Sequence, residues 1–292
     1  MDNTLIIDCN NLCYSSFYTF WKLSYEEKKT GVVFGFLQRI LFLADKFDTN
    51  QFVFCWDSRK SYRKLIYPEY KANRRKDLTE QEKIDYALAF KQFDALREKV
   101  LPGLGFGNVF QQNGYEADDL IAEAVLHTDG EFIVVSTDKD LYQLLHKCDI
   151  YNQRTKKIIT HKDFHKLYDI HCSDWVRIKS LMGDSGDNIP GILGVGIVKA
   201  TQHIKNELFE GKIKDRIISE ESIELTLRNL KLVELPYHGI KKIKMTMKED
   251  EFDRFKFIDI FVDYGFESFL RKDTLNKWVD LFVKEKGRRN QK

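Results

Sequence analysis

Nine acidic residues lie in five short segments of the chain, and their types and spacing could form a site for divalent metal ions. Two carboxylates about 4 Å apart repel each other by about 4 kcal/mol at an effective dielectric constant of about 20. So many ionised groups share one crevice only if some are protonated or if cations neutralise them. Bound metal ions are the simpler solution, and they indicate phosphate chemistry. The residues are Asp8, Asp57, Glu116, Asp118, Asp119, Asp138, Asp140, Asp184 and Asp187.

The predicted strands explain how distant carboxylates could meet. Asp8, Asp57 and Asp138 each follow an apolar run that is typical of a buried strand. Helical spacing of apolar residues from Val33 onward separates the first two runs, which predicts a parallel pair with a crossover helix. In an open α/β sheet, ligands collect at the carboxyl ends of the strands. We therefore expect an α/β fold in which a mostly parallel sheet gathers these carboxylates into one crevice.

Composition bounds the class of protein. The 292 residues suffice for one large domain or two smaller ones, and 43% hydrophobic with 32% charged residues allows both a sizeable core and a solvated surface. No apolar run approaches the roughly 20 residues of a membrane span, and the first residues lack the features of a signal peptide. The five scattered cysteines indicate reduced, buried thiols. We expect a soluble, cytoplasmic protein.

Charge is distributed unevenly, although the net charge is only +2. The stretch from Arg59 to Lys76 is strongly basic, whereas the stretch from Glu116 to Asp140 is strongly acidic. A polyanionic substrate held by cations beside a metal site would suit this pattern. Two solvated surface stretches of opposite charge would also explain this pattern. On charge alone we favour this plainer interpretation.

The segment between the second strand and the next elements is unusually long. Thr79 with Glu82 three residues later forms a capping-box pattern, so a helix is predicted to begin there. Its apolar stripe reaches Val100, and Pro102-Gly103 is predicted to end it. An insertion of this length between core strands is more often functional than idle.

Further elements follow along the chain. Their predicted positions are a weak strand at 109–111, a helix at 116–126, a strand at 132–135, a helix from Asp140 and a hairpin at 150–151 and 157–159. After about Phe164 the pattern becomes mostly helical, with helices near 217–232 and 252–262. No internal repeat interrupts this order.

Each acidic motif also has a plainer explanation. The acids at 116–119 and at 138–140 suit the capping of a helix, and the turn at 183–188 suits an ordinary polar turn without the terminal Glu of a calcium loop. The glycine-rich run at 191–196 could let a phosphate approach the backbone N–H groups of the helix that follows. His161 and His165, with Cys172 beyond them, lack the Glu of the metalloprotease motif, so we interpret these histidines as surface or helix-terminal residues.

Together and in order, these motifs resemble the 5′-nuclease family: flap endonucleases, the 5′-nuclease domain of bacterial DNA polymerase I and stand-alone bacteriophage 5′–3′ exonucleases. The resemblance runs from about Thr4 to Ala200 and is carried by four quoted stretches. These are Tyr-Lys-Ala-Asn-Arg at 70–74, Tyr-Glu-Ala-Asp-Asp at 115–119, Ser-Thr-Asp-Lys-Asp-Leu-Tyr-Gln-Leu-Leu at 136–145 and Met-Gly-Asp-Ser-Gly-Asp-Asn-Ile-Pro-Gly at 182–191.

The resemblance implies a PIN-like fold with a helical arch and a helical C-terminal part. A nuclease core at 1–164 would include the arch at 58–100, and the part at 165–292 would carry a helix–turn–helix element at about 181–206. That element would grip the backbone of duplex DNA, and a potassium ion can bind there in the family.

The resemblance also implies roles for single residues. The nine acids match the family's metal site, Asp8 and Asp57 being counted as catalytic as well. Lys71 and Arg74 match a catalytic basic pair that contacts the scissile phosphate. The implied nucleic-acid contacts are Tyr70, which could stack on a terminal base, and Arg59, Arg63, Arg75, Gly194, Gly196 and Lys199. Many bacterial relatives carry Arg where this chain has Ser15, so one phosphate contact differs.

We therefore expect a nuclease that hydrolyses DNA near 5′ ends, nicks and flaps and leaves 5′-phosphate products. Two Mg²⁺ ions about 3.5–4 Å apart, replaceable by Mn²⁺, would clamp the scissile phosphate. The chain would act as a monomer in the cytoplasm of a bacterial or bacteriophage-infected cell, with RNA–DNA hybrids as a further substrate. A nuclease that removes RNA primers and a non-catalytic protein that binds branched DNA are the alternatives.

Overall fold

The computed structural model describes residues 3–74, 76–238 and 241–283. These residues form two compact units, each assembled from separate stretches of chain. Unit 1 contains Met1–Trp56, Thr79–Phe110 and Met245–Lys292, and unit 2 contains Asp57–Leu78 and Gln111–Lys244. The units follow packing and not sequence order, so the predicted division at residue 164 stays a prediction. Among the described residues, no helix is both long enough and apolar enough to cross a bilayer.

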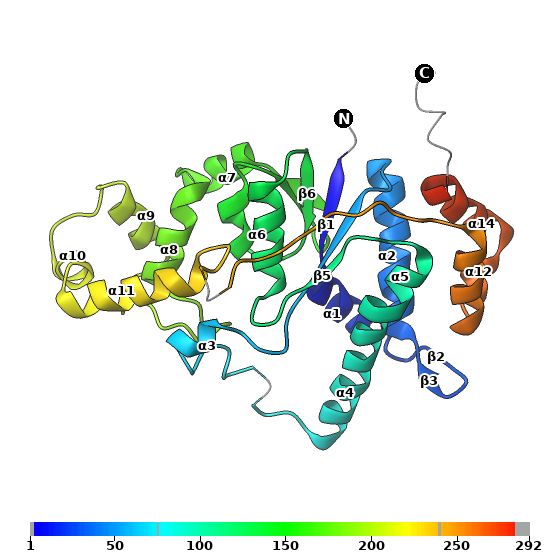
Figure 1. The fold of residues 1–292 in the computed structure, drawn as a ribbon. Coiled ribbons are helices and arrows are strands. Elements are labelled where there is room, and N and C mark those ends of the chain that lie inside the picture. The colour runs from blue at the N-terminus through cyan, green and yellow to red at the C-terminus, as the bar shows by residue number, and fades with distance from the viewer. Residues whose placement is uncertain (1–2, 75, 239–240, 284–292) are drawn as a thin grey trace. The chain divides into compact units, whose positions relative to one another are not determined.

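The strands of unit 1 are β5 (Val109–Gln111), β4 (Phe52–Trp56) and β1 (Thr4–Asp8), in that order. β1 and β4 are parallel, with Asp8 opposite Cys55. Between them in the chain come α1 (Cys9–Phe20), the hairpin β2 (Ser24–Tyr25) and β3 (Lys28–Lys29), and α2 (Gly31–Phe47), as Figure 1 shows. α1 packs on α2, whose apolar stripe is buried. The predicted strand–helix–strand crossover is confirmed.

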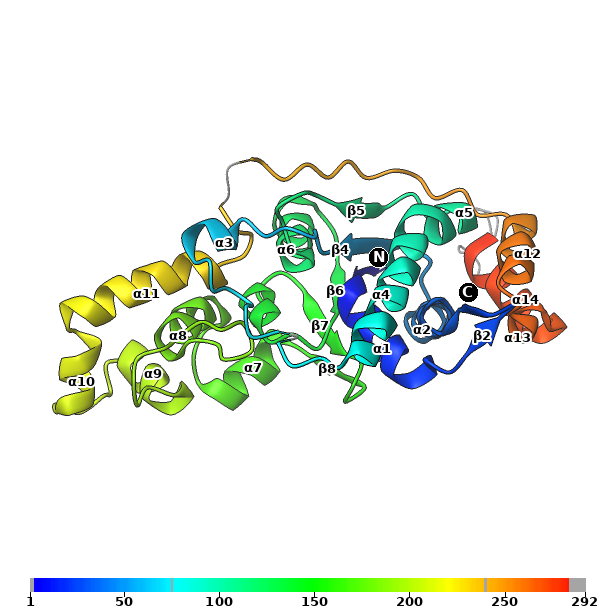
Figure 2. The ribbon, with the colours of Figure 1, turned by 90° about the horizontal axis from the view of Figure 1, so that it is seen from below.

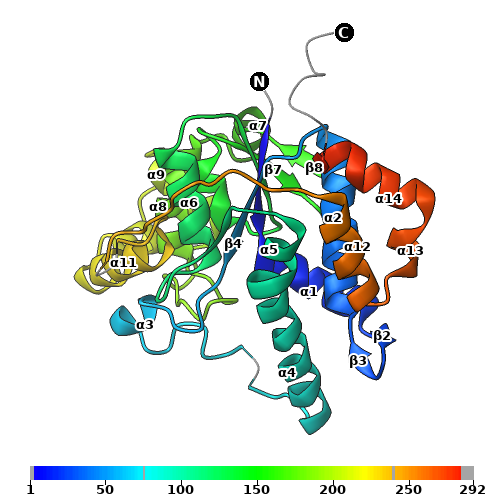
Figure 3. The same ribbon diagram turned by 45° about the vertical axis from the view of Figure 1, so that its right-hand side comes forward.

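The long helix α4 (Glu80–Ala95) of unit 1 begins where the sequence predicts (Figure 3), because Thr79 and Glu82 form the expected capping box. The predicted end is wrong. A π-helical turn, η1 (Leu96–Val100), and a short helix, α5 (Leu101–Leu104), continue the path to Gly105, whose φ is +104°. Pro102 lies in the first turn of α5, where its fixed φ suits the helical backbone.

The last stretch of unit 1 folds as α12 (Arg254–Asp263), α13 (Glu267–Leu270), α14 (Lys272–Trp278) and the π-helical turn η4 (Val279–Val283). Its aromatic side chains complete the core of the unit. Phe269 stacks on Phe34 of α2 with 5.1 Å between the ring centroids, and Trp278 stacks on Phe282 at the same separation. Burial of such large rings is a major apolar contribution to stability.

The sheet of unit 2 has the order β6 (Phe132–Val135), β7 (Asp149–Asn152) and β8 (Lys157–Ile159). β6 and β7 are parallel, whereas β7 and β8 form the predicted antiparallel hairpin. α6 (Ala117–His127) precedes β6, and the 3₁₀ turn η2 (Asp140–Leu144) follows it. Each unit thus contains a parallel pair of strands, β1 with β4 and β6 with β7. The predicted α/β class is confirmed.

The rest of unit 2 is helical. α3 (Arg63–Ile66) follows Asp57, and α7 (His161–Tyr168), the 3₁₀ turn η3 (Cys172–Asp174), α8 (Trp175–Met182), α9 (Ile197–Ile204), α10 (Lys212–Ile217) and α11 (Glu220–Val233) follow β8. α8 packs against both α9 and α11, and Figure 2 shows α8 beside α11. α9 and the turn before it lie within the range predicted for the helix–turn–helix element, whereas α8 reaches only to Met182, at the start of that range.

Candidate active site

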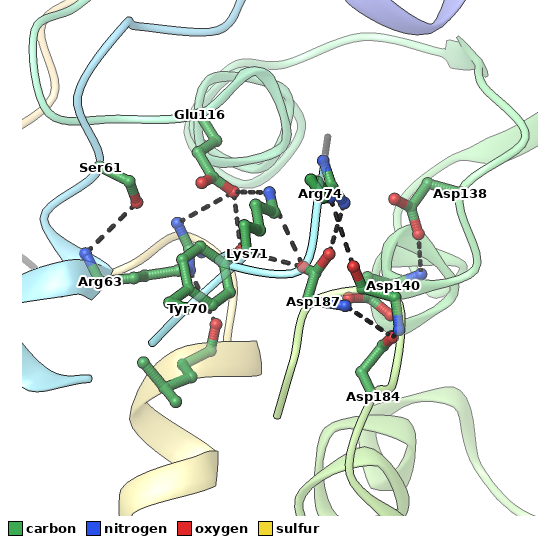
Figure 4. Close-up of polar contacts among 12 residues, drawn as sticks. Ser61, Arg63, Tyr70, Lys71, Arg74, Glu116, Asp138, Asp140, Asp184 and Asp187 are labelled. Atoms are coloured by element: carbon green, nitrogen blue, oxygen red, sulfur yellow. Dashed lines mark hydrogen bonds and ion pairs between the residues drawn. The ribbon is translucent and has the colours of Figure 1, made fainter. Parts of the chain in front are cut away.

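Unit 2 collects its carboxylates around two lysines (Figure 4). We call Asp57, Glu116 and Asp187, with Tyr70, Lys71 and Arg74, the Lys71 group. We call Asp138, Asp140 and Asp184, with Lys179, the Lys179 group. Six of the nine predicted ligands therefore lie in these two groups.

In the Lys71 group nearby cations contact Glu116 and Asp187, whereas burial raises the pKa of Asp57. Lys71 Nζ lies 2.7 Å from Glu116 Oε2, and Arg74 forms an ion pair with Asp187. The hydroxyl of Tyr70 lies 3.0 Å from both Glu116 Oε2 and Asp187 Oδ2, so it links the two acids. Burial alone would raise the pKa of Glu116, but Lys71 and Arg63 lower it to about 2.

The backbone at Lys71 is in an unusual conformation. Its φ is +57°, in the left-handed region that a residue with a Cβ adopts at a cost of about 1–2 kcal/mol. A hydrogen bond of 2.8 Å from Lys71 N to Asp187 O holds the backbone of Lys71 in this conformation. Such conformations cluster at functional sites, where the surrounding structure enforces them. The strain is consistent with a precise placement of the Lys71 ammonium group among the carboxylates.

The Lys179 group has fewer cations than the Lys71 group. Lys179 Nζ lies 2.7 Å from Asp140 Oδ1 and also bonds Asp184, while Asp138 Oδ1 accepts a hydrogen bond of 2.8 Å from Asp140 N. Burial and the charge of Asp138 raise the pKa of Asp140 to about 6, although Lys179 opposes this. Lys179 thus contacts two carboxylates, and Asp138 lies beside them, so the negative charge that remains would attract a cation.

One turn supplies a carboxylate to each group. Asp184 Oδ1 accepts hydrogen bonds from Gly186 N at 2.8 Å and Asp187 N at 3.2 Å, so it also stabilises the turn, as the plainer interpretation expected. Its other oxygen faces Lys179, whereas Asp187 faces Lys71. Gly183 starts the turn with φ +71°, and an added Cβ would lie 2.3 Å from Gly191 N. Only glycine fits this position.

Asp119 and Arg63 form a separate buried pair. Their side chains make two hydrogen bonds of 2.7 and 2.8 Å, and Arg63 Nε donates to Leu232 O at 2.7 Å. Asp119 is fully buried and Arg63 is 2% exposed. The nucleic-acid contact predicted for Arg63 does not fit this geometry, because its guanidinium group is buried against Asp119 and a carbonyl. Asp119 likewise supports the start of α6, where it accepts from Glu116 N at 2.9 Å.

Tyr70 also differs from its predicted role. Its ring is only 2% exposed and lies under the Lys71 ammonium group, 4.9 Å from Nζ to the ring centroid. A ring in this position has no free face for a terminal base. The structure instead uses the hydroxyl group, which joins Glu116 to Asp187.

The other predicted residues lie at several places. Asp118 is partly exposed in the first turn of α6. Asp8 lies in unit 1, where it ends β1, is 6% exposed and accepts a hydrogen bond of 3.1 Å from Asn11 N. Gly194, Gly196 and Lys199 are exposed around the start of α9. Arg75 lies outside the described residues.

A hollow of about 520 Å³ in unit 2 brings cations and carboxylates together. Asp57 and Glu116 line it, and so do the basic side chains Arg59, Lys60, Lys64, Lys71 and Arg74. Basic groups can bind phosphate oxygens, and the carboxylates offer oxygen ligands to a hard cation. The hollow therefore has the chemistry needed to hold a phosphate group beside a metal ion.

Lys179 is the main site residue that sequence reasoning missed. In the sequence it is one of two basic residues, with Arg177, on a short and otherwise largely apolar stretch. The available signal was its place five residues before Asp184, on a helix that leads directly into the acidic turn. A lysine on the buried face of such a helix requires an acidic partner.

Comparison with known proteins agrees with this geometry. The family model described as "5'-3' exonuclease, N-terminal resolvase-like domain" matches residues 3–169. A 5′–3′ exonuclease of Buchnera aphidicola subsp. Schizaphis graminum is 30% identical over 82% of this chain and 81% of its own. A 5′–3′ exonuclease of Bacillus subtilis is 30% identical over 77% of this chain and 70% of its own.

Solved structures give the same family. The T5 D15 protein co-crystallised with metal ions has a TM-score of 0.69 and 25% identity over 96% of this chain and 98% of its own. The bacteriophage T5 D15 flap endonuclease in a pseudo-enzyme–product complex with DNA and metal ions has a TM-score of 0.67, at 25% identity over 96% and 97% of the chains. The family model covers more than half of the sequence, so the chain belongs to the 5′–3′ exonuclease family of nucleases.

Proposed function

We propose that this nuclease binds divalent cations with the two carboxylate groups and hydrolyses DNA phosphodiester bonds near 5′ ends, nicks and flaps. The observation that carries the proposal is the Lys179 group, in which one ammonium group contacts Asp140 and Asp184 while a third carboxylate, that of Asp138, accepts from Asp140 N. The T5 D15 protein, similar over almost its whole length, was crystallised with metal ions and, as a flap endonuclease, with DNA.

The donor set fits a hard cation. Every acid in the two groups offers carboxylate oxygens, which favour Mg²⁺ or Mn²⁺ over zinc. We assign one cation to Asp138, Asp140 and Asp184 and a second to Asp57, Glu116 and Asp187, with Asp8 and Asp118 as further ligands from the sequence match. When bound, these ions would lower the pKa of the attacking water and neutralise charge on the scissile phosphate.

Lys71 and Arg74 would act directly on the phosphate. Both line the hollow, and both now neutralise acids of the Lys71 group. Cations taking over those acids would free the ammonium and guanidinium groups for phosphate oxygens. There they would stabilise the charge that develops in the transition state. Tyr70 would position Glu116 and Asp187 through its hydroxyl group.

The remaining contacts would hold the nucleic acid in place. Arg59, with its neighbours in the hollow, would bind the single strand near its 5′ end. Gly194, Gly196 and Lys199 would bind duplex backbone at the start of α9, because a Cβ at Gly196 would meet only open space and a phosphate can approach its backbone. We also propose that this element binds a potassium ion. RNA–DNA hybrids would be further substrates, and the product would carry a 5′-phosphate.

The first relatives are bacterial exonucleases, and the described residues contain no membrane-spanning helix. We infer a monomer that acts in the cytoplasm of a bacterial or bacteriophage-infected cell.

The test is the variant Asp138→Asn. An amide keeps the oxygen that accepts from Asp140 N but removes the charge, so the fold should persist while a metal ligand is lost. Cleavage of end-labelled DNA flaps in Mg²⁺ should fall by at least about a hundredfold, the upper end of effects seen for groups that only support metal ligands. DNA binding should change little.

Asp129→Asn, in the loop after α6, is the matched control and should cleave like the unmodified chain. Full activity of Asp138→Asn would remove this residue from the mechanism. Cleavage of matched RNA flaps faster than DNA flaps would favour the RNA-primer alternative. Binding of branched DNA without hydrolysis in Mg²⁺ or Mn²⁺ would favour the non-catalytic alternative.

A further inference from the structure

A second group of potential ligands lies outside the acidic site. His161, His171 and Cys172 each offer one ligand atom, and these atoms lie within 4.8 Å of one another. The two imidazole rings are close, with 4.9 Å between their centroids. In a tetrahedral zinc site with bonds of about 2.0–2.3 Å, the ligand atoms lie about 3.3–3.7 Å apart. Movements of about 1 Å would therefore close the three atoms around one ion.

An unexplained polar atom points to a ligand at this place. His161 Nε2 is buried and has no hydrogen-bond partner. A buried polar atom without a partner costs about 1–3 kcal/mol. Coordination of a metal ion would satisfy this nitrogen, and neutral imidazole is the commonest protein ligand for such ions. The acidic site does not use His161, so the function described above leaves this cost unexplained.

Neighbouring groups already orient the other two ligands. His171 Nδ1 accepts a hydrogen bond of 3.2 Å from Ser173 N and lies 2.7 Å from Ser173 Oγ, and these two contacts fix the orientation of the ring. His146 Nδ1 lies 3.0 Å from Gln143 O and 3.8 Å from Cys172 Sγ, so its N–H group points to a carbonyl and toward the sulfur. Hydrogen bonds of this kind behind the ligands orient them and tune their basicity.

We propose that His161, His171 and Cys172 bind one transition-metal ion of the Zn²⁺ type, apart from the Mg²⁺ or Mn²⁺ of the acidic site. Nitrogen and sulfur ligands select Zn²⁺, whereas carboxylates select Mg²⁺, so the two sites would hold different ions. A water molecule would complete the coordination. Burial keeps the pKa of the Cys172 thiol above its usual value, and binding would release that proton to solvent as the metal–sulfur bond forms.

The pair of histidines conspicuous in the sequence is not the pair that meets. His165 Nδ1 lies 3.1 Å from Ile170 O, at the far end of α7 from His161. His171 takes its place because the turn after α7 brings the start of η3 back to the start of α7. The ion would link the first residues of α7 and η3. α8, the helix that carries Lys179, follows η3 directly.

The experiment uses the full chain, freed of metals with a chelator and then held in excess Mg²⁺ to fill the carboxylates. Titration with Co²⁺ should produce a thiolate-to-cobalt absorption band in the near ultraviolet, which carboxylate ligands cannot give. We expect a band that saturates at one Co²⁺ per chain and disappears when Zn²⁺ is added. Absence of this band would overturn the proposal.

His171→Gln and Cys172→Ser test the ligands. His171 is exposed, so its loss should leave the fold intact by circular dichroism while Co²⁺ affinity falls at least about tenfold, the lower end of the effect of altering a metal site. Cys172→Ser should abolish the band, and His165→Gln, the control on α7, should keep it. A band that persists in Cys172→Ser, or unchanged affinity in His171→Gln, would refute the site. Neither result depends on nuclease activity, so the proposed function is tested separately.

Discussion

The two carboxylate groups of unit 2 contain similar acids but differ in their neutralisation. In the Lys71 group, Lys71, Arg74 and the Tyr70 hydroxyl all contact acids, and the pKa of Glu116 is about 2. In the Lys179 group one lysine contacts two of the three acids, and the pKa of Asp140 is about 6. Burial raises the pKa of both acids, and also keeps the pKa of Asp57 in the Lys71 group above its usual value, so the cations that contact each acid decide the outcome.

The difference in nearby cations indicates different roles for the two groups. Cations and donors around Glu116 already hold that carboxylate in its charged form, whereas the Lys179 group keeps negative charge that a metal ion would neutralise. We therefore expect the Lys179 group to respond most to Mg²⁺ and the Lys71 group to act most on the phosphate. Four variants test this comparison, and they are ordered by decreasing size of the effect that we expect.

Arg63→Ala should have the largest effect, because it removes the guanidinium group that is bonded to fully buried Asp119. Leaving a buried charge unpaired costs about 3–5 kcal/mol. The free energy of unfolding in urea should fall by that amount, and the double variant with Asp119→Ala should lose less than the two single changes summed. Unchanged stability combined with weaker DNA binding would restore Arg63 as a nucleic-acid contact.

Lys71→Ala should reduce the cleavage rate by roughly a hundredfold, the scale for loss of one group that stabilises transition-state charge. Its effect on DNA binding should be smaller, since the neighbouring basic side chains of the hollow remain. Single-turnover kinetics and a binding titration in Ca²⁺ separate the two quantities. Lys71→Arg, which keeps the charge, should recover part of the rate; a loss of binding as large as the loss of rate would make Lys71 a docking residue.

Lys179→Ala should leave the Lys179 group without its ammonium ion. We expect a loss of about 2 kcal/mol in a chelator, less than for the fully buried pair because Asp184 is partly exposed. Mg²⁺ should then raise the melting temperature more than it does for the unmodified chain, since ion binding to the folded state adds stability. Arg177→Ala on the same helix, whose ion pair with Asp174 is exposed, should show no such change. An equal Mg²⁺ response in both would contradict the comparison.

Asp250→Asn should have the smallest effect and the opposite sign. Burial raises the pKa of Asp250 in unit 1 to about 6, as it does for Asp140, and Gly107 N donates a hydrogen bond of 2.7 Å to its carboxylate. A raised pKa means that ionisation costs stability as pH rises from about 4 to 6. The amide avoids this cost, so we expect a gain of about 1 kcal/mol at pH 7, reduced for partial exposure, and none below about pH 4.

Urea unfolding at several pH values measures the effect of Asp250→Asn. The variant should show no altered response to Mg²⁺, because no second acid or lysine of the two groups is involved. A gain in stability that stays constant down to pH 3 would show that ionisation of Asp250 is not its cause.

Local patterns in the sequence predicted the parts of the fold that depend on neighbours in the chain. The apolar runs before Asp8, Asp57 and Asp138 are strands, and Thr79 with Glu82 caps α4. These features follow from side-chain periodicity and from hydrogen bonds that span three residues. The same patterns placed the acids at strand ends and helix starts, so most of the candidate site could be predicted.

Features that depend on distant contacts could not be predicted this way. Burial of Arg63 requires Asp119 and Leu232, and the partners of Lys179 are set by how α8 packs. His161 meets His171 through the return of the chain after α7, which no spacing rule indicates. The π-helical turn that carries the helix past Pro102 is likewise a response to packing, since every residue from Leu96 to Val100 suits an ordinary helix.

The composition of unit 1 has a consequence for synthesis on the ribosome. Its core joins β1, α1 and α2 to helices that are translated more than two hundred residues later, through contacts such as Phe34 with Phe269. Domains usually fold in the order in which they emerge. Here the first-made stretch must wait with its apolar side chains uncovered, so we expect a nascent chain halted before residue 245 to be a strong client of chaperones.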